Sequence, residues 1–196
     1  HIPSKYIWKV GERLQKLSYN WYDLNGVKDD PVLGDKFIKA YENRKEVILR
    51  SSAYLRVYDS QGRAAGLIEG EVAQEIPNSI YDPNSIYDGE EREIVIIFFP
   101  IDSYRYEVVG REEGTYRLTI NSAEEGDITG FEAIDIPTSA GVVHQYTIDW
   151  DILSQGEEGV TVQMDFDGDG TFELTITAGS TFIFIPATID IDPDTL

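Results

Sequence analysis

From about residue 46 onward, apolar and polar side chains alternate along the chain in short runs. A period of two is typical of β-strands that bury one face and expose the other. Turn residues separate the runs, and no helical pattern lies between them. Short strands at fairly regular spacing predict a mainly β fold, with antiparallel strands in a sandwich or a barrel-like sheet. The alternating runs span residues 54–58, 104–109, 116–120, 142–148, 160–166 and 172–177.

Two further runs, residues 94–99 and 181–185, are apolar at both parities. This pattern is typical of strands that are covered on both faces. We therefore expect both runs to be strands with no solvated side. One face of such an interior strand offers a place where a helical segment can pack.

The first segment of the chain follows a helical period instead. Apolar residues recur every three or four positions along residues 7–24, and Asn25-Gly26 supplies a helix stop. Asp30-Pro31 is typical of a second helix start, with an N-cap residue followed by proline at the first helical position. We predict a helical pair that covers a hydrophobic face elsewhere in the protein. The apolar positions are Ile7, Val10, Leu14, Leu17, Trp21 and Leu24 in the first helix and Leu33, Phe37, Ile38 and Tyr41 in the second.

The formal net charge of −20 is divided unevenly along the chain. Residues 1–50 carry +3 and contain all seven lysines, whereas residues 51–196 carry −23. This acidity argues against nucleic-acid binding, which needs a strong basic patch. The lack of cysteine excludes disulfide scaffolds, thiolate zinc sites and cysteine nucleophiles. No run of apolar residues approaches the roughly 18 that a membrane-spanning helix needs.

The change in composition near residue 50 predicts the domain organisation. We expect residues 1–50 to be a helical segment that packs on the β domain or ends an upstream domain. Residues 51–186 then form the β domain, and residues 187–196 begin a linker or a following module. The alternating pattern that starts near residue 187 favours a piece of a longer, multidomain protein.

Several different turn-and-strand motifs lie between Leu55 and about Thr181, at residues 57–63, 75–79, 106–110, 114–119 and 165–173. This stretch resembles the β-rich accessory domains of large secreted or surface-attached archaeal and bacterial proteins. Its Tyr106–Ile120 portion is similar to pre-peptidase C-terminal domains, which end in a comparable Gly-x-Tyr-x-Leu-x-[Ile/Val] strand. The resemblance implies a non-catalytic module, extracellular or at the cell surface, beside catalytic, protease or adhesive domains. Implied partners are neighbouring domains of the same polypeptide, a cell-surface protein or a glycan.

One segment has the spacing of metal ligands: Asp165-x-Asp167-x-Asp169-Gly170-x-x-Glu173. Calcium takes six to eight oxygen ligands, and carboxylates at positions 1, 3, 5 and 9 with glycine at 6 match the first part of an EF-hand-type loop. The full loop fails because position 12 is Ile176, where a bidentate glutamate is required. We therefore expect Ca²⁺ as the candidate cofactor, with a weak Kd of about 10⁻⁴ to 10⁻³ M.

The flanks of this segment predict a hairpin, because apolar residues alternate on both sides of it. Asp165 and Glu173 then lie on the face opposite the apolar set, while Asp167 and Asp169 crown the turn. The alternative is a solvated acidic turn, in which the glycines only supply positive φ angles. Three aspartates within five residues repel one another unless a cation or water relieves them, which favours the ion.

Other candidate residues carry a weaker signal. The sequence Asn-Ser-Ile-Tyr-Asp occurs twice, at 78–82 and 84–88, and places Tyr81 and Tyr87 in a polar loop where they can stack on sugars. Its alternative is a surface loop that two isoleucines hold to the sheet. Asp149 and Asp151 flank Trp150 in a segment expected to be extended, and paired carboxylates beside an aromatic ring suggest sugar hydrolysis. The alternative is a solvated strand edge.

The single internal histidine, His144, shares parity with apolar residues of its run, so we expect it in the core. With no second internal histidine and no Gly-x-Ser-x-Gly elbow, the sequence offers no serine triad. The leading hypothesis is therefore a non-catalytic accessory module stabilised by calcium. The alternatives are a carbohydrate-binding module and the C-terminal fragment of a secreted hydrolase.

Overall fold

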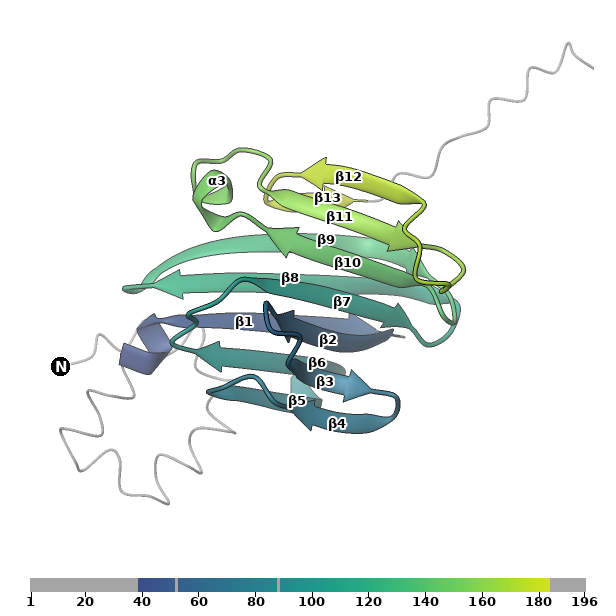
Figure 1. Cartoon of the computed structure of the whole chain (residues 1–196), viewed down its shortest axis with the longest axis horizontal. Coiled ribbons are helices and arrows are strands. Elements are labelled where there is room, and N and C mark those ends of the chain that lie inside the picture. The colour runs from purple at the N-terminus through teal and green to yellow at the C-terminus, as the bar shows by residue number, and fades with distance from the viewer. Residues whose placement is uncertain (1–38, 52, 88, 184–196) are drawn as a thin grey trace, which may run out of the picture.

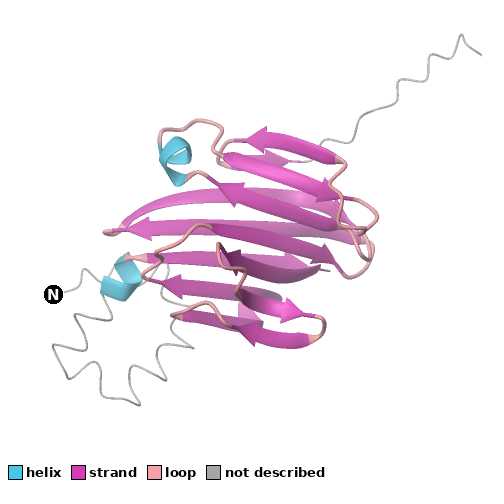
Figure 2. Cartoon of the chain, in the orientation of Figure 1, coloured by secondary structure: helices cyan, strands magenta, loops and turns pink. Residues whose placement is uncertain are grey.

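The structure, a computed structural model, describes residues 39–183 except Ser52 and Asp88. Figures 1 and 2 show two layers of strands with few helical residues. Within the described residues, the predicted mainly β, sandwich-like arrangement is confirmed, and neither sheet closes into a barrel. Every strand pair is antiparallel except β13 with β9.

The first sheet has six strands, in the spatial order β13-β9-β8-β1-β6-β5. Its strands are β1 (Arg44–Ser51), β5 (Ser79–Tyr87), β6 (Glu90–Phe98), β8 (Gly114–Glu124), β9 (Asp127–Thr138) and β13 (Thr181–Ile183). The second sheet has the order β12-β11-β10-β7-β2-β3-β4. Its strands are β2 (Ala53–Asp59), β3 (Ala64–Ile68), β4 (Glu71–Gln74), β7 (Tyr104–Gly110), β10 (Val143–Ile148), β11 (Val160–Asp165) and β12 (Leu174–Ala178).

The main core fills the space between the two sheets, and alternation along each strand builds it. In β2, the buried residues are Ala53, Leu55, Val57 and Asp59, while the residues between them are half-buried. The same alternation appears in β7, β8 and β11. Each fully buried aliphatic side chain of this kind contributes about 1.5–3 kcal/mol of transfer free energy, so the alternation is the main source of the fold's stability.

The expected domain boundary at residue 50 falls inside β1. This strand pairs with β6 from Arg44 to Leu49 and with β8 from Arg44 to Ser51. The β domain therefore begins no later than Arg44. Residues 39–42 are helical and lead directly into it. The rest of the predicted helical pair and the predicted module start at residues 187–196 lie outside the described residues.

Several local predictions differ from the structure. The run at 94–99 is covered on both faces from Ile94 to Ile97, as expected, but β13 buries only Phe182 because it is an edge strand. The repeat at 78–88 contributes β5 instead of a loop, with a bulge between Asp82 and Ser85. The segment after β10, expected to be extended, turns into helix α3 (Trp150–Ser154).

Candidate metal centre

The four predicted carboxylates lie on the hairpin that joins β11 to β12. The two strands pair from Val160 with Ala178 to Met164 with Leu174, so the predicted hairpin is confirmed. Asp165 ends β11, and the turn spans residues 166–173. Figure 1 shows this turn at one end of the second sheet.

Backbone hydrogen bonds to the carboxylates shape the turn. The carboxylate of Asp165 accepts bonds from the N–H groups of Gly168, at 2.6 Å, and Gly170, at 2.9 Å. Asp167 Oδ1 accepts from the N–H group two residues on, at 3.2 Å, and Asp169 Oδ1 does the same at 2.7 Å. Such Asx-turns are why aspartate is favoured in tight turns. The acidic residues thus hold the backbone of their own loop.

Glycine is required at position 168 for two reasons. Its φ of +75° lies in the left-handed region, which strains residues with a side chain. A Cβ atom there would also lie 2.7 Å from the carbonyl oxygen of Gly141, so the acidic turn packs closely on the neighbouring turn. Gly170, with φ +90°, has no atom near an added Cβ, so only its backbone conformation favours glycine.

The carboxylates converge. Asp165, Asp167, Asp169 and Glu173 each offer one oxygen, and these oxygens all lie within 4.8 Å of one another. Asp165 is only 2% exposed, whereas the other three are exposed. Glu173 closes the turn from the β12 side, because its Oε2 accepts a bond from the N–H of Phe166 at 2.7 Å. The arrangement can therefore hold a metal ion from one side while leaving the other side open to water.

Asp165 is held in its charged form by its surroundings. Burial alone would raise its pKa, but hydrogen bonds from backbone N–H groups of the turn, those of Gly170 and Gly168 above all, outweigh this and hold the pKa below its ordinary value. A carboxylate that stays ionised beside three others is suited to a hard cation. Ile176, at position 12 of the motif, pairs with Val162 inside the hairpin, so no carboxylate completes the loop from that position.

The candidate sugar-binding residues do not form one surface. Tyr81 lies on β5, is 7% exposed and donates a hydrogen bond to Glu93 Oε2 at 2.9 Å. Trp150 begins α3 and packs on the main core, with Lys45 Nζ 4.4 Å from its ring centroid. Tyr87 ends β5. In Figure 1, β5 and α3 lie far apart, at the bottom and the top of the molecule.

Asp149 and Asp151 lie at the N-terminal end of α3 instead of on an extended strand edge. Asp149 is the N-cap residue, and its Oδ1 accepts a hydrogen bond from the N–H of Ile152 at 3.1 Å. Asp151 is in the first helical turn, where a negative charge favours the helix dipole. Both aspartates therefore have a structural role in starting the helix.

His144 lies in the core, as expected, at 2% exposure. Its Nδ1 is 2.8 Å from the hydroxyl of Tyr116, which also hydrogen-bonds the hydroxyl of Tyr146. Within the described residues, its Nε2 has no hydrogen-bond partner. Burial lowers the pKa of His144 to about 4, so the ring is neutral at neutral pH. The sequence predicted a core position for His144 but offered no signal that it meets Tyr116 across the two sheets.

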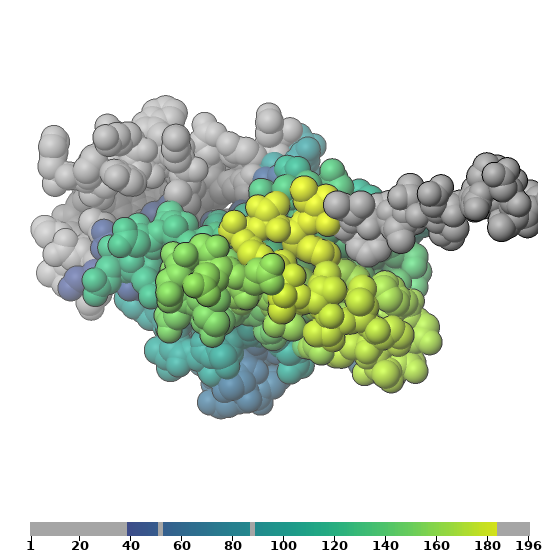
Figure 3. All heavy atoms as spheres, turned by 90° about the horizontal axis from the view of Figure 1, so that it is seen from above, coloured from purple at the N-terminus to yellow at the C-terminus, as the bar shows by residue number. Residues whose placement is uncertain are grey.

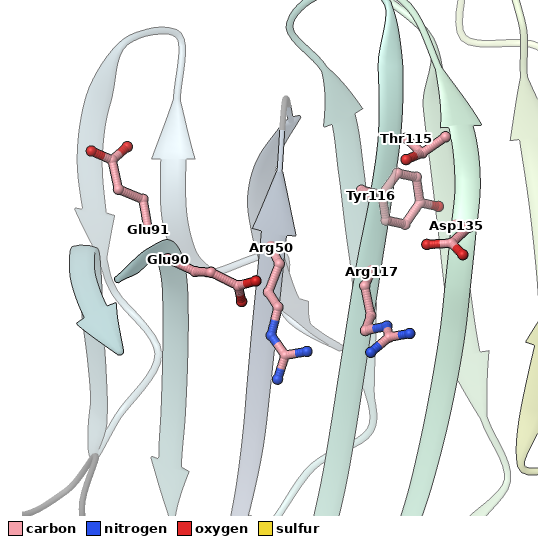
Figure 4. A pocket seen from close by; sticks show the side chains of 7 residues that line it. All are labelled: Arg50, Glu90, Glu91, Thr115, Tyr116, Arg117 and Asp135. Atoms are coloured by element: carbon pink, nitrogen blue, oxygen red, sulfur yellow. The ribbon is translucent and has the colours of Figure 1, made fainter. Parts of the chain in front are cut away.

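A pocket of about 450 Å³ on the outer face of the first sheet was also missed by the sequence analysis. Figure 4 shows Arg50 and Arg117 projecting side by side from β1 and β8, where their Cα atoms are direct partners. A bulge in β9 places two residues opposite Arg117, and Asp135 there has φ +53°. The pocket is lined by Arg50, Glu90, Glu91, Thr115, Tyr116, Arg117 and Asp135. Its mixed charge points to no single class of ligand.

Comparison with family models, curated proteins and solved structures finds no significant match to this chain. In the described part of the chain, no helix has the length and apolar character needed to cross a membrane.

Proposed function

We propose that this chain is a non-catalytic accessory β-sandwich module of a larger extracellular or cell-surface protein, and that one Ca²⁺ ion at the β11–β12 turn stabilises it. The observation that carries the calcium proposal is the convergence of four carboxylate oxygens within 4.8 Å on a turn already held by its own backbone bonds. The accessory role and the location rest on the resemblance of residues 55–181 to such domains.

The ion would link strands β11 and β12. Asp165 belongs to β11 and Glu173 immediately precedes β12, so a shared ion joins the two ends of the turn. It would also neutralise charges that repel one another at this spacing. Because the unfolded chain does not hold the four groups together, binding raises the free energy of unfolding by mass action.

The non-catalytic role is part of the proposal, and two groups of described residues bear on it. Their only histidine, His144, is buried in the core, away from any substrate. The carboxylates of the acidic turn are each engaged by a backbone N–H group. Neither set has the arrangement of a serine-type triad, in which a histidine base activates a neighbouring hydroxyl nucleophile.

Thermal unfolding with Ca²⁺ and with chelator tests the proposal. For a Kd of about 10⁻⁴ to 10⁻³ M, about 10 mM Ca²⁺ should stabilise the protein by about 1.4–2.7 kcal/mol, or about 3–11 °C for a chain of this size. The test variant is Asp167→Asn with Asp169→Asn. Asparagine keeps the side-chain oxygen that accepts each backbone bond but removes the charge, so the fold should survive while the calcium shift disappears.

The matched control is Glu112→Gln with Glu113→Gln, which removes two exposed charges from the turn that links β7 of the second sheet to β8 of the first. This variant should keep the full calcium shift. An equal concentration of Mg²⁺, which prefers a smaller octahedral site, should give a much smaller shift. Equal midpoints in Ca²⁺ and in chelator for the unmodified chain would refute the calcium proposal.

A further inference from the structure

The outer face of the first sheet carries an apolar cluster of its own. Ile48 on β1 and Ile94 and Ile96 on β6 point away from the main core and are 5%, 4% and 2% exposed. Tyr41 and Phe98 pack against them. We call these five residues the outer cluster. The second sheet covers only the inner face, so the outer cluster needs a different cover.

The strands around the outer cluster have the pattern of an interior layer. Ile94, Val95, Ile96 and Ile97 are buried in succession, whereas a strand with one solvated face buries every second residue. β1 behaves alike, with buried residues from Arg44 to Leu49. Isoleucine side chains that are only 2–5% exposed must be covered by another part of the protein, so this face is a docking surface.

We propose that residues 1–38 of the same chain cover the outer cluster. The helical residues 39–42 connect residues 1–38 to β1, so this segment joins the described part of the chain beside the outer cluster. Tyr41 already lies on the outer cluster, and the guanidinium of Arg44 fixes it there. That guanidinium lies 4.0 Å from the ring centroid of Tyr41 and donates to its carbonyl oxygen at 2.5 Å.

The sequence of the segment suits this position. Its apolar residues recur at intervals of three and four between Ile7 and Leu24, a spacing that would align them on one face of a helix. A second copy of the chain or an unrelated protein has no such connection to the face.

Distance-dependent quenching in the full chain tests this proposal. Two of the three tryptophans, Trp8 and Trp21, lie in the segment, so Trp150→Phe leaves only these two to emit. The chain has no cysteine, and Thr119→Cys therefore gives a single site for a nitroxide label. Thr119 pairs with Ile48, at the centre of the outer face. The matched control is Thr161→Cys, on the outward face of the second sheet, with far-UV circular dichroism to show that each labelled variant is folded.

A nitroxide at position 119 should cause a loss of tryptophan emission relative to a diamagnetic label, and a nitroxide at position 161 should not. The loss should persist unchanged on dilution, because the contact is within one chain. Two results would overturn the proposal: equal emission with the nitroxide and the diamagnetic label at position 119, or equal quenching by nitroxides at positions 119 and 161. Quenching that disappears on dilution would assign the outer cluster to a second copy and overturn it too.

Discussion

Acidification from about pH 7 to about pH 5 should destabilise the protein through His144. The ring is buried beside Tyr116, with its pKa lowered to about 4, whereas an unfolded histidine titrates at its ordinary 6.5. Below pH 6.5 the unfolded chain therefore binds a proton that the folded chain does not. The stabilisation is fully present above pH 6.5 and is lost as the pH falls towards 4.

The size of the effect follows from the two pKa values. Over the interval from about pH 7 to about pH 5, a shift from 6.5 to about 4 corresponds to a loss of about 2 kcal/mol in the free energy of unfolding. The effect of Glu93 on stability has the opposite sign, because burial raises its pKa. Its contribution to the free energy of unfolding falls as the pH rises above the pKa that Glu93 has in the unfolded chain. The pKa values of Asp59 and Asp165 are lowered, so these two residues change the free energy of unfolding only at pH values below this interval.

Urea denaturation at a series of pH values measures this effect. The comparison protein is His144→Asn, since an asparagine amide can still face the Tyr116 hydroxyl but does not titrate in this range. Contributions from Glu93 and from the terminal His1 are common to both proteins and cancel in the difference. The unmodified chain should lose about 2 kcal/mol more than the variant between the two pH values. Parallel stability curves would show that His144 is not held neutral by burial and would refute the argument.

Two substitutions test the packing of the acidic turn and of the buried hydroxyl. Gly168→Ala should destabilise the protein more than Gly170→Ala, because only the first substitution places a Cβ against a neighbouring carbonyl oxygen. Gly170→Ala should cost about 1 kcal/mol for its positive φ alone. Equal unfolding midpoints of the two variants would contradict this packing. Tyr116→Phe should cost about 1–3 kcal/mol in chemical denaturation, since it leaves His144 without its partner. Tyr54→Phe, at a half-buried position, is the control and should be near neutral.

The candidate metal centre was predictable because it is local. All four carboxylates lie within nine residues, and the turn that gathers them is made by aspartate and glycine conformations that the sequence itself encodes. Strand positions such as β7 and β11 were predictable for the same reason, since alternation is a property of neighbouring residues. The helix α3 was missed because its start depends on the capping bond of Asp149, which competed with an apparently extended pattern.

Strands β1, β3, β4, β5 and β9 were not predicted. Most of β1 was included in the expected helical segment, whereas β5 and β9 were missed for a different reason. β5 contains Pro83 and a bulge, and β9 contains Gly130, Pro137 and a bulge, all of which resemble loop sequence. Their partners compensate for these local weaknesses: β9 pairs with β8 along almost its whole length. Tertiary context therefore overrode local propensity at these positions.

The sequence by itself determined the mainly β class, the strands with regular alternation and the acidic hairpin turn, because each depends on residues close together in the chain. Only the tertiary structure decided that β1 lies between β6 and β8, that Tyr81 is buried against Glu93, and that His144 meets Tyr116 across the core. An alternating strand has the same pattern whichever neighbour it pairs with. Strand order and the contacts between the sheets therefore arise from non-local packing, which no single stretch of the chain encodes.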